Sequence, residues 1–216
     1  MKNILVIGMG RFGTHIVQEL SNLKCDIMAV DTSEVKLRNV SEYVTKTVIG
    51  NATDIEFMKT LGVSNFDDCI VAIGDNFQNS LLTVLNLKEL GAKRITARAA
   101  FESQEILLQK IGADTIVYPE KQLAKQTALQ CGTDSVYDFM DLDDDYGVYE
   151  MSVPEKWVGK TLMELDLRKK YNINIIGAKA DAKIKMILHS DFKLQANERL
   201  LIVAKSEDMQ KILNIK

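Results

Sequence analysis

The sequence contains few of the side chains from which catalytic and metal sites are usually built. Its 216 residues include only three cysteines and two histidines. The cysteines, Cys25, Cys69 and Cys131, are more than forty residues apart, so no pair has the spacing of a zinc ligand set or of a disulfide framework. We therefore expect three small core or surface residues in a protein of a reducing compartment.

Signatures of the common catalytic machineries are also absent. His15 and His189 lie far apart in the chain and belong to no H-E-x-x-H or Ser-His-Asp pattern. The G-x-x-x-x-G-K-[ST] loop that binds phosphates in many ATP-hydrolysing enzymes is missing as well. Isolated histidines are more often structural than catalytic. We predict that the chain is not an enzyme.

Charge and hydropathy argue against two kinds of direct partner. The formal net charge is −3, and no dense cluster of lysine and arginine is interleaved with aromatic residues, so we expect no binding to nucleic acid. The longest apolar runs have the length of a strand, too short to cross a bilayer, and we recognise no secretory segment. We expect a cytoplasmic protein that reaches a membrane only through a partner.

Residues 1 to about 118 alternate between short apolar runs and segments with helical periodicity, such as Phe12, Ile16 and Leu20. The runs are nearly continuously apolar, which is typical of parallel strands covered on both faces. The six expected strands are 3–8, 26–30, 46–50, 69–74, 94–98 and 115–119. We predict an α/β fold with a Rossmann-like, doubly wound parallel sheet.

The alternation ends after an expected helix at 120–132. An acidic run from Asp141 to Asp145 follows, and we interpret 134–147 as a solvated linker. A divalent-cation loop is the alternative, although the run lacks the glycine and the terminal glutamate of an EF-hand. Residues 1–133 are then the predicted nucleotide-binding domain.

Residues 148–216 are predicted to form a small α+β domain without a catalytic constellation. Its expected strands are 148–153, 173–179, 183–188 and 199–203, and its expected helices are 160–171 and 206–213.

The first expected strand leads into VIGMGRFGTHI, residues 6–16. Gly8, Gly10 and Gly13 have the spacing of a dinucleotide-binding turn between a strand and a helix. The first glycine permits the tight turn, the second lets phosphate approach the backbone, and the third lets helix and strand pack closely. The helix N-terminus offers free N–H groups to an anion. Asp31, at the end of the second strand, is placed to bind ribose hydroxyls and to repel a 2′-phosphate, which disfavours NADP.

Arg11 favours a nucleotide with a third phosphate. Backbone groups suffice for a pyrophosphate, whereas a guanidinium in the first helical turn adds charge-assisted hydrogen bonds to a more highly charged tail. A cation is otherwise mildly unfavourable beside the positive end of a helix dipole. Arg98 ends the fifth strand on the same sheet edge and either adds positive potential or serves in a structural ion pair. These residues favour ATP or ADP, with NAD or NADH as the alternative.

Several segments together resemble the RCK (regulator of conductance of potassium) family, and within it the cytosolic gating subunits of bacterial Ktr/Trk-type potassium uptake systems. They are GMGRFG (8–13), AVD (29–31), GNATD (50–54), AIGDN (72–76), KIGAD…YPEK (110–121) and GKTLMELDLRKKYNINIIGAK (159–179). The resemblance covers essentially the whole chain, with an RCK N-terminal domain at 1–133 and an RCK C-terminal regulatory and dimerisation domain at 148–216.

The resemblance implies dimers that assemble into a ring, usually an octamer, docked beneath a membrane potassium transporter or channel subunit. The chain would then be peripheral to the inner face of the cell membrane. In this family ATP favours the conducting ring and ADP the closed one. An NAD(H)-binding regulator of a Trk-type transporter, which shares the glycine turn, is the alternative.

The predicted nucleotide contacts combine the residues above with those that the resemblance supplies. They are Gly8, Gly10, Arg11, Phe12, Gly13, Asp31, Asn51, Ala52, Asp54 and Arg98. By resemblance, Arg11 would reach the γ-phosphate, and residues 51, 52 and 54 would lie near the adenine. Glu120 would help to hold a divalent cation, Mg²⁺ or Ca²⁺, against the γ-phosphate across a dimer interface. From the residues alone, Glu120 is equally an acid favoured by a helix dipole.

The small domain of this family often binds cyclic di-AMP between two copies. Arg168, Asn174 and Ile175 stand at matching positions of LRKKYNINII. This chain departs from the family at Ala178-Lys179-Ala180 and lacks the usual proline near Leu188. A dimerisation module without this ligand is the alternative.

Overall fold

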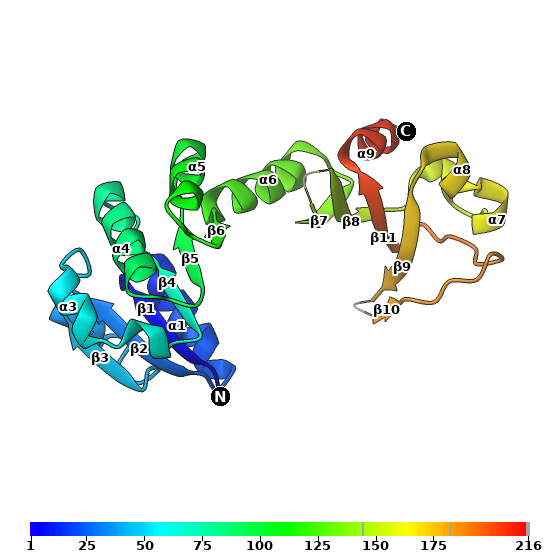
Figure 1. Cartoon of the computed structure of the whole chain (residues 1–216). Coiled ribbons are helices and arrows are strands. Elements are labelled where there is room, and N and C mark those ends of the chain that lie inside the picture. Colours follow the sequence, from blue (N-terminus) through cyan, green and yellow to red (C-terminus); the bar gives the residue numbers. More distant parts are fainter. Residues whose placement is uncertain (144, 182, 215–216) are drawn as a thin grey trace. The chain divides into compact units, whose positions relative to one another are not determined.

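The computed structural model describes residues 1–143, 145–181 and 183–214 (Figure 1). The chain divides into two compact units, Met1–Pro119 and Glu120–Lys216. Each unit contains one sheet. None of the described helices is both long enough and apolar enough to cross a membrane.

The first unit is built on a six-stranded sheet in which every pair of neighbouring strands is parallel. The strands are β1 (Asn3–Ile7), β2 (Asp26–Asp31), β3 (Lys46–Ile49), β4 (Asp68–Val71), β5 (Ile95–Arg98) and β6 (Thr115–Val117). Their order is β3-β2-β1-β4-β5-β6. The predicted doubly wound sheet is confirmed. Its winding reverses between β1 and β4, the point at which such sheets bind ligands beyond the carboxyl ends of the strands.

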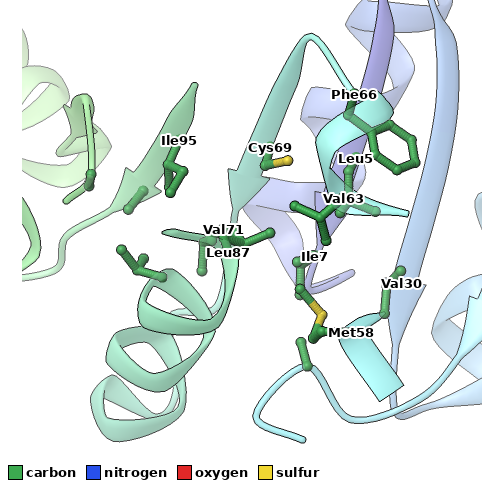
Figure 2. Close-up of a cluster of buried hydrophobic side chains, with 14 of the residues drawn as sticks. Leu5, Ile7, Val30, Met58, Val63, Phe66, Cys69, Val71, Leu87 and Ile95 are labelled. Atoms are coloured by element: carbon green, nitrogen blue, oxygen red, sulfur yellow. The ribbon is translucent and has the colours of Figure 1, made fainter. Parts of the chain in front are cut away.

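Helices cover both faces of this sheet. The residues of β1 alternate between two buried clusters, one on each face. Ile4 and Val6 join one cluster, which includes residues of α1 and α2. Leu5 and Ile7 join the other, to which α3, α4 and α5 contribute. Figure 2 shows part of this second cluster. The helices are α1 (Arg11–Asn22), α2 (Glu34–Arg38), α3 (Ile55–Thr60), α4 (Phe77–Glu89) and α5 (Glu102–Lys110), with a 3₁₀ turn at Val63–Asn65.

Cys69 lies in the second cluster and is fully buried (Figure 2). Burial, with a smaller contribution from the neighbouring Asp68 carboxylate, raises the pKa of its thiol to about 12. The thiol therefore stays protonated at neutral pH and unreactive, because the thiolate is the nucleophile. Cys69 is an apolar core residue, as expected.

The second unit is built on a five-stranded antiparallel sheet. The strands are β7 (Val136–Asp141), β8 (Tyr146–Ser152), β9 (Asn174–Ala180), β10 (Lys183–Lys185) and β11 (Arg199–Lys205), in the order β10-β9-β11-β8-β7. The helices are α6 (Pro119–Gly132), α7 (Leu162–Leu165), α8 (Leu167–Tyr171) and α9 (Ser206–Leu213), with a 3₁₀ turn at Glu155–Trp157. A third buried cluster, separate from those of the first unit, forms its core.

The segment predicted as a linker, 134–147, is largely part of this sheet. β7 pairs with β8, and Val136 and Phe139 are buried in the core. Two aspartates of the acidic run form ion pairs: Lys125 pairs with Asp141, and Lys205 pairs with Asp145. The strand is therefore held by its pairing with β8 and by its buried side chains, with the ion pairs at its exposed end.

Asp143, which follows β7, accepts two backbone hydrogen bonds with its side chain. Its Oδ1 accepts the N–H groups of Asp145 at 2.9 Å and Tyr146 at 2.6 Å. These hydrogen bonds lower the pKa of the Asp143 carboxyl. Asp144 lies outside the described residues. Among the residues that are described, no cluster of three or more His, Cys, Asp or Glu side chains is arranged to hold a metal ion.

Two expected elements of the second unit are shorter than predicted. The helix expected at 160–171 is interrupted at Asp166, whose φ of +46° lies in the left-handed region and separates α7 from α8. Aspartate tolerates this conformation better than most residues, since its short side chain can hydrogen-bond locally. The strand expected at 183–188 ends at Lys185.

Candidate nucleotide-binding site

The glycine turn connects β1 to α1 with the geometry that its spacing predicts. Gly8 has a φ of +97°, which favours glycine, and its N–H donates to the carbonyl of Val30 at 2.8 Å. A Cβ on Gly13 would lie 1.9 Å from the Gly8 carbonyl oxygen, so α1 packs directly against the turn. A Cβ on Gly10 would meet no atom within 4 Å. Packing therefore requires Gly8 and Gly13, whereas Gly10 leaves open space above the backbone.

The N-terminus of α1 has no anionic group of its own. Gly10 is the N-cap and provides no side-chain hydrogen bond, and the first turn contains no acidic residue. The exposed side chain at its first position is Arg11. By contrast, α2 and α3 each have a side-chain cap and an acid in the first turn. The positive end of the α1 dipole is thus left for an external anion.

Asp31 is fixed beside the turn at the end of β2. Its Oδ2 accepts the N–H of Met9 at 2.7 Å, and its Oδ1 accepts the N–H of Ser33 at 2.8 Å. Each carboxylate oxygen keeps a second lone pair for a ribose hydroxyl. The ribose role of Asp31 stays a prediction. Its hydrogen bond with Met9, which anchors the glycine turn, was not expected, because no sequence pattern reports it.

The loop after β3 lies next to Asp31 and is held by its own polar side chains. The Gly50 N–H donates to the carbonyl of Asp31 at 3.1 Å. Asn51 Oδ1 accepts the N–H of Thr53 at 3.1 Å, and Asp54 Oδ1 accepts the N–H of Glu56 at 2.9 Å. The Asn51 and Asp54 side chains therefore shape the loop.

Ala52, between these two side chains, is buried, and its carbonyl accepts Nδ2 of Asn86 at 3.0 Å. The structure thus places all three residues, Asn51, Ala52 and Asp54, on the sheet edge beside Asp31. Their contact with adenine stays a prediction.

Asp54 is the N-cap of α3, which gives a testable consequence. Asp54→Ala should lower the free energy of unfolding by about 0.5–2 kcal/mol, the usual cost of a lost N-cap. Asp54→Asn should be nearly neutral, since asparagine caps equally well. Urea denaturation of both variants checks this. Equal destabilisation by alanine and asparagine would show that the charge, rather than the cap, matters.

Arg98 lies on the other side of the turn, at the end of β5. In the loop after β4, Ile73 packs against Gly8: a Cβ on Gly8 would lie 3.1 Å from both Cγ1 and N of Ile73. At the next residue, a Cβ on Gly74 would lie 2.0 Å from Nη1 of Arg98. The guanidinium carbon of Arg98 is 5.8 Å from the ring centroid of Phe12 in α1. The structure thus brings Arg98 and Phe12 together beside the glycine turn.

The contribution of Ile73 and Gly74 to this edge of the sheet was not predicted from the sequence. The available signal was a glycine directly after the fourth strand, in AIGDN, at the end where ligands bind.

Glu120 is the second residue of α6 and supplies an acid to the first turn of that helix. It belongs to the second unit. Its role toward a cation stays a prediction.

The second unit has a pocket of about 350 Å³ whose walls include all three residues predicted to bind a second ligand, Arg168, Asn174 and Ile175. Arg168 Nε donates to Asn174 Oδ1 at 3.0 Å. Leu188 and Ser190 also line the pocket. The structure therefore gathers residues from α8, β9 and the segment after β10 into one hollow.

Two family models match the chain, the TrkA-N domain at residues 4–119 and the TrkA-C domain at residues 148–216. Ktr system potassium uptake protein C of Bacillus subtilis (strain 168) is 37% identical over 210 residues, which cover 97% of this chain and 95% of that protein. The chain belongs to the TrkA, or RCK, family of potassium uptake proteins. Ktr system potassium uptake protein A of the same organism is 35% identical over 99% of this RCK chain and 96% of its own length.

Solved structures agree with this assignment at the level of the fold. A GsuK RCK domain superposes with a TM-score of 0.67 at 17% identity, and a GsuK channel bound to NAD with a TM-score of 0.68 at 17% identity. Each match covers 99% of this RCK chain, which spans less than half of either GsuK chain, 47% and 39% respectively. The TrkA-N domain of the Escherichia coli inner membrane protein ybaL matches 60% of this chain and 96% of its own length, with a TM-score of 0.54 at 23% identity.

The matched regions also bear on the boundary between the two halves. The TrkA-N match ends at residue 119, where the first compact unit ends, rather than at the predicted 133. Residues 120–132 form α6 of the second unit.

Proposed function

We propose that this chain is the nucleotide-sensing regulatory subunit of a Ktr-type potassium uptake system. It binds ATP or ADP at the glycine turn and acts without catalysing a reaction. It assembles from dimers into an octameric ring on the cytoplasmic side of the membrane and gates a membrane transporter subunit. Ktr relatives that match over nearly their full length support the transport role.

The observation that carries the nucleotide proposal is the arrangement at the α1 N-terminus. The helix has neither a side-chain cap nor an acid in its first turn, and the space above Gly10 is open. The two sides of the turn differ in charge, since Asp31 lies on the β2 side and Arg98 on the β5 side. An adenine nucleotide fits this polarity: its ribose pairs with the carboxylate and its phosphates with the helix N-terminus and the guanidinium.

Arg11 is the proposed reader of the third phosphate. A charge-assisted hydrogen bond contributes about 1.5–3 kcal/mol, and moving a two-state equilibrium from 1:99 to 99:1 takes about 5.5 kcal/mol. One additional contact in each subunit of a ring is therefore sufficient to switch it. We propose that Glu120 completes the site by holding Mg²⁺ or Ca²⁺ against the γ-phosphate across the dimer interface.

Thermal stabilisation of the purified protein by ATP, ADP, NAD⁺ and NADH, with and without Mg²⁺, tests the proposal, because a ligand of the native state raises the melting temperature according to its affinity. ATP with Mg²⁺ should stabilise most. Arg11→Ala should weaken ATP binding by about 10- to 150-fold and spare ADP, as expected for one lost charge-assisted contact. Arg38→Ala, at an exposed arginine paired with Glu34, is the matched control.

NAD(H) is the second candidate, supported by the dinucleotide-type turn and by the NAD bound to the GsuK channel of similar fold. If NADH stabilises the protein most and Arg11→Ala affects all four ligands alike, the redox-linked alternative replaces the ATP proposal.

We also propose that the pocket of the second unit binds cyclic di-AMP. A guanidinium held by Asn174 suits a phosphate, and Ile175 adds an apolar wall for a base. The same stabilisation assay with cyclic di-AMP tests this assignment; an unchanged melting temperature favours a dimerisation module.

A further inference from the structure

We infer that Arg98 determines which class of nucleotide the site accepts, because its side chain lies where the second nucleoside of a dinucleotide would bind. Arg98 would then favour a nucleoside triphosphate and disfavour NAD or NADH. The inference rests on the proposed function and adds a specificity determinant to the same site.

The topology divides the site into two halves. A doubly wound sheet contains two mononucleotide-binding halves, which meet where the strand order reverses. Here these halves are β1-β2-β3 and β4-β5-β6. Asp31 and the loop after β3 belong to the first half. The second half begins at the loop after β4, where Ile73 packs against Gly8.

Arg98 lies across the start of this second half. The Arg98 guanidinium lies very close to Gly74. A Cβ added to Gly74 would be only 2.0 Å from Nη1 and 3.0 Å from Cζ of Arg98. A glycine at this position lets the guanidinium lie directly against the loop backbone. The same guanidinium is 5.8 Å from the ring of Phe12, which follows Arg11 in the first turn of α1. It therefore reaches from β5 to both the loop after β4 and the turn.

Two physical effects then distinguish the nucleotide classes. The side chain fills space that a second nucleoside would require. Its positive charge attracts the end of a triphosphate, which lies on the far side of the turn from Asp31, and repels the cationic nicotinamide ring of NAD⁺. A dinucleotide has no terminal phosphate to pair with it.

Two substitutions separate the steric effect from the electrostatic one. Arg98→Ala removes both the bulk and the charge, whereas Arg98→Met keeps a long side chain over Gly74 without the charge. We expect both variants to bind ATP about tenfold more weakly, as for one lost charge-assisted contact. Only Arg98→Ala should bind NADH more tightly, so that the NADH-to-ATP affinity ratio rises by more than tenfold.

Isothermal titration of the full chain with ATP, ADP and NADH measures these ratios, with Arg38→Ala as the control. Equal weakening of ATP and NADH by Arg98→Ala would overturn the inference and leave Arg98 as a source of general positive potential. If Arg98→Ala does not fold, Arg98→Met still decides, because an unchanged ATP affinity in that variant also overturns it. If the wild-type chain binds none of these nucleotides, the proposed function itself fails. If the wild-type chain binds ATP but the NADH-to-ATP affinity ratio is unchanged in Arg98→Ala, only this inference fails.

Discussion

Gly13→Ala is expected to cause a large loss of stability in the first unit. The new methyl group would lie 1.9 Å from the backbone carbonyl oxygen of Gly8, and no side-chain rotation can relieve that overlap. Either α1 moves away from β1 or the turn deforms, and both disturb the buried cluster that contains Val17. We expect the free energy of unfolding to fall by about 3 kcal/mol or more, at or above the upper end of the usual cost of overpacking.

Two other glycines provide matched controls for this result. Gly132→Ala, in α6, meets no atom within 4 Å and should be neutral or stabilising by up to about 1 kcal/mol, since alanine is the better helix former. Gly10→Ala also meets no atom within 4 Å, so the fold should be preserved, but its methyl group would cover the open backbone and abolish stabilisation by ATP. Denaturant unfolding with and without ATP measures both effects. A Gly13→Ala protein as stable as wild type would show that α1 does not pack on the turn as described.

The second large effect is expected at Glu150, a buried carboxylate on β8. Its two oxygens accept Nζ of Lys179, both at 3.0 Å, and Oε1 also accepts Nη1 of Arg199 at 3.0 Å. The Arg199 guanidinium in turn lies 3.6 Å from the ring centroid of Tyr137. Burial alone would raise the pKa of the Glu150 carboxyl, but the hydrogen bonds and charges of the two cations outweigh it and lower this pKa.

Glu150→Gln should destabilise the second unit at neutral pH by about 1–3 kcal/mol, because two cations lose their charged acceptor. A carboxyl whose pKa is lowered by folding contributes its full stabilisation above its unfolded pKa, about 4.3, and loses it as the pH falls through the folded value. The difference between wild type and variant should therefore shrink in acid.

Urea unfolding at pH 7 and at successively lower pH values below about 4 tests the Glu150 prediction. Glu34→Gln, in an exposed pair with Arg38, is the control and should change little, since exposed ion pairs contribute little stability. A difference between wild type and Glu150→Gln that is independent of pH would mean that shape rather than charge accounts for the effect.

The sequence was sufficient to predict the first unit because its signals are local. The central strand β1 is a nearly continuous apolar run, and the Gly8–Gly13 spacing marks where β1 passes into α1. In the second unit the decisive interactions are distant in sequence. The segment of β7 was predicted as a linker because its acidic composition does not show that it pairs with β8 and buries Val136 and Phe139 in the core.

The candidate site shows the same limit. The glycines, Asp31 and Arg11 could be assigned from spacing and from their places at strand and helix ends. The hydrogen bond from Met9 to Asp31 and the contact of Arg98 with Gly74 depend on how separate loops meet at the sheet edge, which spacing does not report. The left-handed Asp166 was likewise hidden in a segment whose apolar residues have continuous helical spacing.

The separate cores of the two units matter for how such a chain evolves. Residues 1–119 bury their own apolar clusters, and residues from 120 onward bury another. Selection for stability therefore acts on distinct sets of core residues in the two halves. Recombination between genes can also exchange one half as a unit, which fits the occurrence of a TrkA-N domain within a different inner membrane protein.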